Sequence, residues 1–169
     1  AQVFLSQDAG ALGALSQAGL FAALPDDVAE AVPAGFTSTD GSWVGLTGRA
    51  RVVVYDSEEL SADELPDTVL EYVEPEWAGR LGLPPGNASF QSFVTALRVI
   101  EGEQVAEDWV EALASNDLQI FENNTATLTA VNEGALDVGL INHYYWFRQA
   151  AEVGAENMRA QIAFLEAGD

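Results

Sequence analysis

Cysteine and lysine are absent from this chain of 169 residues, and histidine occurs once, as His143. The absence of cysteine excludes disulfide bonds, thiolate metal ligands and thiol nucleophiles. A single histidine excludes metal sites that need two imidazoles, and any serine–histidine design would depend on His143. No apolar run approaches the ~18 residues of a membrane-spanning helix, so we expect no membrane insertion of this segment.

Basic residues are few: six arginines stand against 27 acidic residues, which gives a net charge of −21. Such a surface repels the phosphates of nucleic acids and of anionic lipids, so neither is expected as a partner. It attracts cations only weakly and without selectivity, so the charge alone does not predict a metal site. Apolar residues make up 49% of the chain, which indicates a folded globular protein.

Short apolar runs alternate with amphipathic segments along the chain. The clearest strand is predicted at 51–55, where the continuous run Arg-Val-Val-Val-Tyr indicates burial on both faces. Further strands are predicted at 3–5, 81–83, 118–121, 138–141 and 161–166, and helices after an N-cap at Asp8 and at 89–100, 104–114, 125–132 and 142–151. This order predicts an α/β fold with a mostly parallel sheet flanked by helices.

Three strand-to-helix junctions of this pattern are candidate binding positions, at 84–89, 122–125 and 142–145. In open α/β sheets, ligands bind beyond the carboxyl ends of the strands. Each junction is rich in small or amide residues and presents backbone N–H groups at a helix N-terminus. Such N–H groups are suited to binding an anion.

Tyr144 and Tyr145 are adjacent at the third junction. Fe(III) is a hard ion that favours oxygen ligands, and a bound trivalent ion lowers the pKa of a phenol far below its ordinary value of about 10. The alternative is that both tyrosines pack in the core beside Trp146 and Phe147. The tyrosine pair alone does not decide between these two interpretations.

Five stretches of the chain together resemble the ferric-ion-binding proteins of bacterial ABC transporters, a branch of the type II periplasmic-binding-protein fold. They lie in the family's order at 3–12 (VFLSQDAGAL), 43–55 (WVGLTGRARVVVY), 89–96 (SFQSFVTA), 123–126 (NNTA) and 137–145 (DVGLINHYY). The resemblance implies that Tyr144 and Tyr145 are the paired tyrosinate ligands of a ferric ion. It also implies that a small synergistic anion, phosphate or carbonate, completes the coordination.

The resemblance further implies roles for other residues. The positions that match the family's anion-binding residues are Asn87, Ala88, Ser89, Asn124 and Asn142. Gln7 stands where some members have a glutamate ligand, and it is a candidate cleft contact but a poor direct ligand for Fe(III). Ser89 stands where other members have a third tyrosine. His143 is not a metal ligand in the family pattern and is expected to pack or hydrogen-bond behind the site.

The family's chains are considerably longer than this one, and the chain starts in what reads as the middle of a strand. We therefore expect a fragment of an exported, periplasmic or extracytoplasmic protein whose signal is missing from this sequence. Residues 1–50 are expected to be a remnant of the first lobe with the hinge, and 51–169 to be most of the second lobe. The resemblance implies binding of ferric iron for delivery to an ABC transporter permease, with no enzymatic activity.

Two other functions stay open. A receptor for a small anion or an organic solute could use the same scaffold, with the tyrosines stacking or hydrogen-bonding, and Gln7 in place of glutamate keeps this alternative open. An enzyme would need His143 to act with a carboxylate such as Asp137. The sequence shows no nucleophile elbow, phosphate loop or paired-histidine metal motif for such an enzyme. Visible charge-transfer colour with Fe(III) distinguishes the iron protein from the anion or solute receptor.

Overall fold

The structure is a computed structural model that describes residues 3–7 and 9–165. The chain divides into two compact units, Ala1–Gly48 and Arg49–Asp169. The assignment of 1–50 and 51–169 to two lobes of a larger fold stays a prediction, because compactness alone does not identify a lobe. In the described part of the chain, none of the helices has the length and apolar character needed to cross a membrane.

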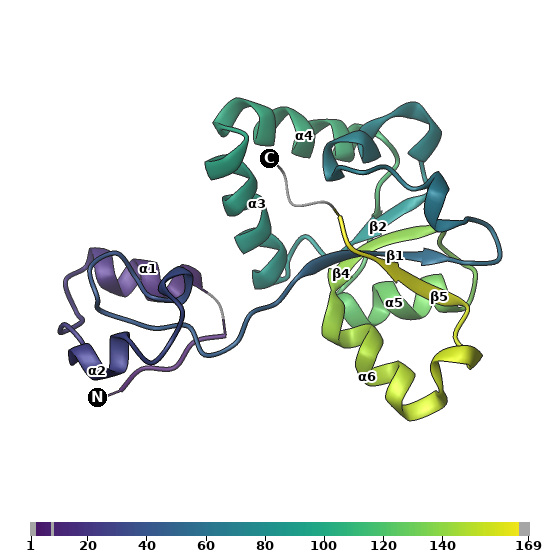
Figure 1. Cartoon of the computed structure of the whole chain (residues 1–169). Helices are drawn as coiled ribbons and strands as arrows, with labels where there is room; N and C mark the ends of the chain where they lie inside the picture. The colour runs from purple at the N-terminus through teal and green to yellow at the C-terminus, as the bar shows by residue number, and fades with distance from the viewer. Residues whose placement is uncertain (1–2, 8, 166–169) are drawn as a thin grey trace. The chain divides into compact units, whose positions relative to one another are not determined.

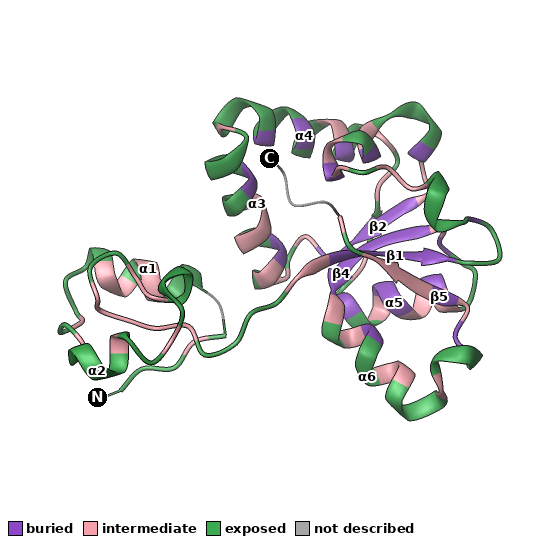
Figure 2. Ribbon diagram, viewed as in Figure 1, coloured by how far each residue is buried: buried purple, intermediate pink, exposed green. Residues whose placement is uncertain are grey.

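The first unit is built from short elements. It contains the helices α1 (Ala9–Gln17) and α2 (Asp26–Ala29), the 3-10 helix η1 (Ala34–Phe36), and a β-bridge between Thr37 and Val44. None of the described residues of this unit is fully buried (Figure 2). Its apolar side chains therefore do not form a dry core of their own.

The prediction of a strand at 3–5 is wrong. Val3, Phe4 and Leu5 lie in irregular structure with exposed fractions of 77%, 47% and 80%. A strand needs a neighbouring strand that forms hydrogen bonds with its backbone. Among the described residues, no strand pairs with residues 3–5. The N-cap predicted at Asp8 lies outside the described residues.

A five-stranded sheet forms the centre of the second unit, in the order β3-β2-β4-β1-β5 (Figure 1). Its strands are β1 (Arg51–Asp56), β2 (Leu81–Leu83), β3 (Gln119–Ile120), β4 (Val138–Asn142) and β5 (Ala160–Ala163). β2 is parallel to β3 and to β4, whereas β1 is antiparallel to both of its neighbours, β4 and β5. Four strands thus run in one direction, as predicted for a mostly parallel sheet, and β1 runs against them.

Helices cover both faces of the sheet. α3 (Ala88–Ile100) and α4 (Glu103–Ser115) lie on one face, and α5 (Asn124–Asn132) and α6 (His143–Val153) lie on the other (Figure 1). Short 3-10 helices complete the unit: η2 (Ala62–Glu64), η3 (Val69–Val73), η4 (Pro75–Trp77) and η5 (Ala155–Asn157). The sequence pattern predicted each of the four α-helices to within two residues at either end.

The core has two layers because successive strand residues point to opposite faces. Val53 packs with the residues of α3 and α4, and Val52 and Val54 pack with those of α5 and α6. All three valines are fully buried, as their continuous β-branched run predicted (Figure 2). Burial of each such side chain contributes about 1.5–3 kcal/mol to folding, so β1 contributes substantially to the stability of the unit.

Two paired glycines let α5 and the residues that flank it lie close against the sheet. Gly82 of β2 and Gly139 of β4 are register partners. A Cβ on Gly139 would come within 2.5 Å of Thr127 Cγ2 on α5, and a Cβ on Gly82 would come equally close to Leu136 and Phe121. Thr127 of α5 therefore takes the space that a side chain at 139 would occupy, and Leu136 and Phe121, which flank α5 in the sequence, take the space at 82.

We predict that Gly139→Ala lowers the free energy of unfolding by about 1–3 kcal/mol, because the added methyl group overpacks the interface between β4 and α5. Gly86→Ala is the matched control, since a Cβ there meets no atom within 4 Å. Chemical denaturation of both variants measures the difference. Equal stability of the two variants would show that the close approach of α5 is not a packing constraint.

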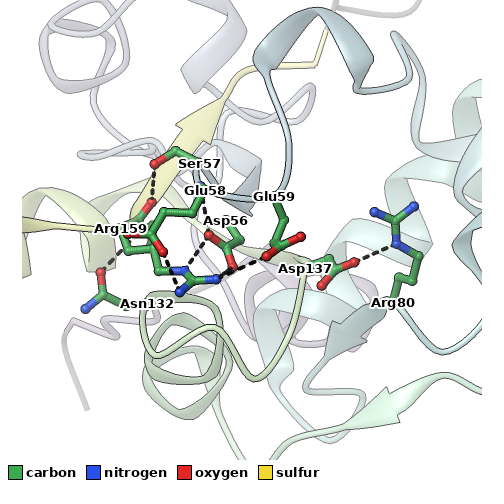
Figure 3. Close-up of polar contacts among 9 residues, drawn as sticks. Asp56, Ser57, Glu58, Glu59, Arg80, Asn132, Asp137 and Arg159 are labelled. Carbon is green, nitrogen blue, oxygen red and sulfur yellow. Dashed lines mark hydrogen bonds and ion pairs between the residues drawn. The ribbon is translucent and has the colours of Figure 1, made fainter.

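An ion-pair network lies at the end of the sheet where β1 ends and β5 begins (Figure 3). Asp56, whose side chain is 1% exposed, accepts two hydrogen bonds from Arg159, at 2.6 Å from Nε and 2.5 Å from Nη2. Arg159 also pairs with Glu58 at 2.6 Å, and the adjacent Ala160 N–H donates to Asn132 on α5 at 3.1 Å. The network therefore ties together β1, β5 and α5.

The pKa of the Asp56 carboxyl reflects opposing effects. Burial alone would raise it, but the hydrogen bonds from Arg159 and from the backbone N–H of Glu58 outweigh burial and leave the pKa below its ordinary value. A carboxyl with a depressed pKa stabilises the fold above the pKa of the unfolded chain, about 3.9, and this contribution is lost as the pH falls below that value.

We predict that Asp56→Asn is less stable than the wild type at pH 7 and that the difference narrows as the pH falls below about 4. At low pH the wild-type carboxyl is protonated, so both proteins then carry a neutral group beside Arg159. Urea denaturation of both proteins at pH 7, 5 and 3 measures this difference. A difference that stays constant across the three pH values would contradict the assignment.

Candidate functional site

Three helix N-termini converge at one edge of the sheet, the one formed by the carboxyl ends of its parallel strands. The parallel strands β2, β3 and β4 end at this edge, and the antiparallel β1 begins there. α3, α5 and α6 start directly after those strand ends (Figure 1). The three junctions predicted as binding positions therefore lie together, and each helix contributes the positive end of its dipole to this edge.

Asparagines hold the first turns of these helices in place. Asn87 caps α3 by accepting a hydrogen bond from Ser89 N–H at 3.0 Å, and Asn123 caps α5 by accepting one from Ala126 N–H at 2.9 Å. Asparagine is among the residues preferred at this position. Asn142 precedes α6 and makes no capping bond with its side chain, which is buried.

Arg51 joins the helix N-termini to one another. Its Nη2 donates to Ser89 Oγ on α3 at 3.0 Å, and its Nη1 donates to Asn124 Oδ1 on α5 at 3.0 Å. The same Asn124 oxygen accepts the backbone N–H of Asn142 at 3.3 Å. One guanidinium thus connects four of the elements that meet at this edge, namely β1, α3, α5 and the end of β4.

The charge of Arg51 has no carboxylate beside it. The ion pairs among the described residues use Arg80, Arg98 and Arg159. The Arg51 guanidinium instead lies over the Phe90 ring, 5.8 Å from its centroid. Burial lowers the pKa of Arg51 to about 10, although the nearby tyrosines oppose this shift. At neutral pH the group therefore keeps a positive charge at the base of the site.

Two buried donors at this edge lack an acceptor. Among the described residues, Arg51 Nε and Asn124 Nδ2 are buried nitrogens at this edge with no hydrogen bond of good geometry, and Asn124 is fully buried. The Asn124 amide lies close enough to the Tyr145 hydroxyl to lower the pKa of that phenol. A buried donor left without an acceptor costs about 1–3 kcal/mol, so native proteins seldom retain one without a reason. Two such donors beside three helix N-termini are typical of a site that binds an anion.

Tyr144 and Tyr145 begin α6 at the same edge. Their rings stack with centroids 4.4 Å apart, and Tyr144 is 37% exposed. Trp146, by contrast, is buried and donates its indole N–H to Ala160 O at 2.7 Å. The core-packing interpretation therefore suits Trp146 but not Tyr144, which points away from the core.

The environment of Tyr145 opposes its ionisation in the metal-free protein. Its hydrogen bond with Tyr144 and its partial burial raise the pKa of Tyr145, while the Asn124 amide and the Arg148 guanidinium oppose that shift. The guanidinium carbon of Arg148 lies 5.6 Å from the centroid of the Tyr145 ring. A metal ion would supply the further positive charge that favours ionisation of Tyr145.

The structure brings together most of the residues that the sequence singled out. Asn87, Ser89, Asn124 and Asn142 belong to one hydrogen-bonded cluster, and Ala88 is the first residue of α3. Gln7 lies in the first unit, so its role as a cleft contact stays a prediction. The described residues contain no group of three or more histidine, aspartate or glutamate side chains placed to hold a metal ion, so any metal here depends on other oxygen ligands.

Two arginines of the site were missed by the sequence analysis. Arg51 was assigned only to a strand, although it is the one charged residue that opens a buried β-branched run. Arg148 was not considered, although it follows Tyr145 by three residues, a spacing that places both side chains on one side of a helix. In each case the signal was the position of a rare basic residue in a strongly acidic chain.

A family model for bacterial extracellular solute-binding proteins matches residues 1–165. The chain belongs to this family. The chain spans about half the length of the curated relatives it matches.

The relatives of this solute-binding protein carry names that refer to iron. It is 36% identical over 174 residues to the major ferric iron-binding protein of Neisseria meningitidis, covering 100% of this chain and 51% of the relative. It is 32% identical over 169 residues to the Fe(3+)-binding periplasmic protein of Serratia marcescens, covering 100% of this chain and 50% of the relative.

Solved structures have the same fold. Iron-bound HitA from Pseudomonas aeruginosa matches with a TM-score of 0.88 and 30% identity, covering 97% of this chain and 53% of that one. The Trichodesmium protein IdiA (FutA), in complex with iron and citrate, matches with a TM-score of 0.80 and 27% identity, covering 92% and 51%. The α/β fold predicted from the sequence is therefore confirmed as that of these iron-binding proteins.

We predict that Arg51→Lys loosens the first turns of α3 and α5 in this solute-binding protein, because one ammonium group cannot bridge Ser89 and Asn124 as the planar guanidinium does. Exchange of the Ser89 and Ala126 amide hydrogens should be about tenfold faster or more, since hydrogen bonds to charged groups contribute about 1.5–3 kcal/mol. NMR-detected hydrogen exchange measures this effect.

The control for Arg51→Lys is Arg98→Lys at an exposed arginine that pairs with Glu103. This change should leave the exchange of both amides unaltered. If Arg51→Lys also leaves them unaltered, Arg51 does not hold the helix N-termini together.

Proposed function

We propose that this chain binds Fe(III) outside the cytoplasm for delivery to an ABC transporter permease, with Tyr144 and Tyr145 as the protein ligands and a small anion, phosphate or carbonate, as the co-ligand. The observation that carries the proposal is the pair of unpartnered buried donors, Arg51 Nε and Asn124 Nδ2, beside two adjacent phenols. The iron-related names of the relatives and the iron-bound structure of HitA support it.

The tyrosines supply the ligand chemistry. Phenolate is a hard oxygen donor, and a trivalent ion favours the ionised form strongly enough to overcome the raised pKa of Tyr145. Two phenolates leave one positive charge on Fe(III) uncompensated. An anion removes that charge and fills coordination positions that the two phenols cannot reach.

The anion would accept hydrogen bonds from groups already oriented at this edge. Arg51 and Asn124 offer their unpartnered N–H groups, and the first turns of α3 and α5 add backbone donors. Ala88 and Ser89 belong to the turn of α3, and the Asn142 side chain makes no capping bond that would occupy it. Asn87 acts indirectly in this proposal, since its side-chain oxygen accepts from both the amide and the hydroxyl of Ser89.

Family membership supports the location and the transport role. Bacterial extracellular solute-binding proteins act outside the cytoplasm, and we propose the same location for this chain. The partner we propose is a membrane permease of the ABC class. The site binds and releases its cargo, and no reaction step is assigned to it.

A receptor for a small anion or an organic acid is the second candidate. The observation in its favour is that Arg51 already carries its charge and its unpartnered donor without any metal. The Trichodesmium relative was solved with both iron and citrate, so an organic acid would also be an acceptable co-ligand. In this case the tyrosines would hydrogen-bond the solute and would not ionise.

We predict that ferric citrate produces a visible tyrosinate-to-iron band in the wild type and that the double variant Tyr144→Phe/Tyr145→Phe lacks it. Tyr55→Phe is the matched control, because Tyr55 is buried in β1 and pairs with Val138 at the other end of β4. The titration is run with and without phosphate or bicarbonate. A band that strengthens when the anion is present supports the co-ligand.

Two results would contradict the proposal. A band of equal strength in the double variant would exclude Tyr144 and Tyr145 as ligands. If the wild-type chain gives no band, the titration is repeated on a longer solute-binding protein that contains this sequence. Continued absence there, together with calorimetric binding of the anion alone, would favour the anion or solute receptor.

A further inference from the structure

His143 contacts the residue that precedes β1 through both its side chain and its backbone. Its ring Nδ1 accepts the backbone N–H of Ala50 at 3.1 Å, and the Ala50 carbonyl oxygen lies 3.3 Å from the same nitrogen. The backbone N–H of His143 donates to that carbonyl oxygen at 3.0 Å. When Nδ1 accepts the Ala50 N–H, the neutral ring carries its proton on Nε2.

The same imidazole packs against three aromatic rings. Its centroid lies 6.1 Å from that of Tyr144, 6.1 Å from that of Phe147 and 6.5 Å from that of Phe164. Tyr144 and Phe147 belong to α6, whereas Phe164 directly follows β5. One side chain therefore contacts the segment that leads into β1, the segment that leaves β5, and one of the proposed iron ligands.

Apart from His143, the neighbouring Tyr145 holds the Tyr144 side chain, through ring stacking and a hydrogen bond between the two hydroxyls. The side chain is exposed and its ring stacks on Tyr145 along one face. A side chain that is free to change rotamer must lose that freedom when it binds a metal, which lowers the affinity. The edge contact with the fixed His143 ring restricts Tyr144 before the ion arrives.

We infer that His143 is a positioning residue that holds Tyr144 in its ligand orientation by anchoring the start of α6 to Ala50. This inference rests on the proposed function, since it assigns a purpose to the orientation of Tyr144. The role needs a hydrogen-bond acceptor at the Nδ1 position and makes no use of a change in protonation.

Two variants of nearly equal shape separate positioning from packing. In His143→Asn the Oδ1 atom is as many bonds from Cα as Nδ1 was, so it can accept the Ala50 N–H. In His143→Leu the branching is the same but no acceptor is present. The first readout is hydrogen exchange of the Ala50 amide in the metal-free protein, and the second is the rate at which the ferric form loses its visible band to a competing chelator.

We expect His143→Asn to keep the Ala50 amide protected and to release iron at a rate near that of the wild type. His143→Leu should lose the protection and release iron about fivefold faster, the factor that one net hydrogen bond of about 1 kcal/mol gives. Iron release at the same rate from both variants, with Ala50 exposed only in the leucine variant, would overturn the inference. Asparagine behaving like leucine would also overturn it.

Failure of the inference and failure of the proposed function give different results. If the wild type shows a ferric band but the two variants do not differ, the inference alone is wrong. If neither this chain nor the longer protein shows a band, the proposed function is wrong and the positioning role falls with it. Should His143→Leu fail to fold, the wild type still decides, because an Ala50 amide that exchanges as fast as a free peptide would exclude the hydrogen bond to His143.

Discussion

The buried positive charge of Arg51 is the constraint on which the rest of the site depends. A guanidinium removed from water is stable only when its donors find acceptors, and here those acceptors come from Ser89 on α3 and Asn124 on α5. The position of Asn124 in turn requires α5 to lie close to the sheet, which the glycine at 139 allows. The packing of small residues in the core therefore determines where the polar groups of the site meet.

Much of the fold and part of the site could be predicted from the sequence, because the signals are local. Residues 51–55 formed a β-branched run, and Asn87 and Asn142 stood where strands give way to helices, so elements and junctions followed from periodicity and capping. The importance of Arg51 could not be predicted in this way. It depends on β1 running antiparallel to β4, which brings the start of one strand beside the end of the other, and no local pattern encodes that pairing.

The wrong prediction of a strand at 3–5 also reflects information that is not local in the sequence. Val3, Phe4 and Leu5 have the composition of a buried strand, yet they are exposed in the structure. Burial depends on a partner surface, and hydrophobic periodicity describes only one side of that interface. The opposite end of the sheet shows a comparable limit, because the burial of the Asp56 carboxylate depends on its pairing with Arg159, 103 residues away in the sequence.

The charges of the site explain why a metal and an anion would bind together in the proposed function. The chain as a whole is strongly acidic, and its long-range field attracts cations. At the tyrosines the local charge is reversed, because Arg51 is buried there and Arg148 lies over the Tyr145 ring. An Fe(III) ion with two phenolates keeps one positive charge beside these arginines, so binding of the metal alone is opposed by repulsion that burial intensifies. An anion between the metal and Arg51 turns that repulsion into attraction on both sides, and synergy is then a consequence of electrostatics.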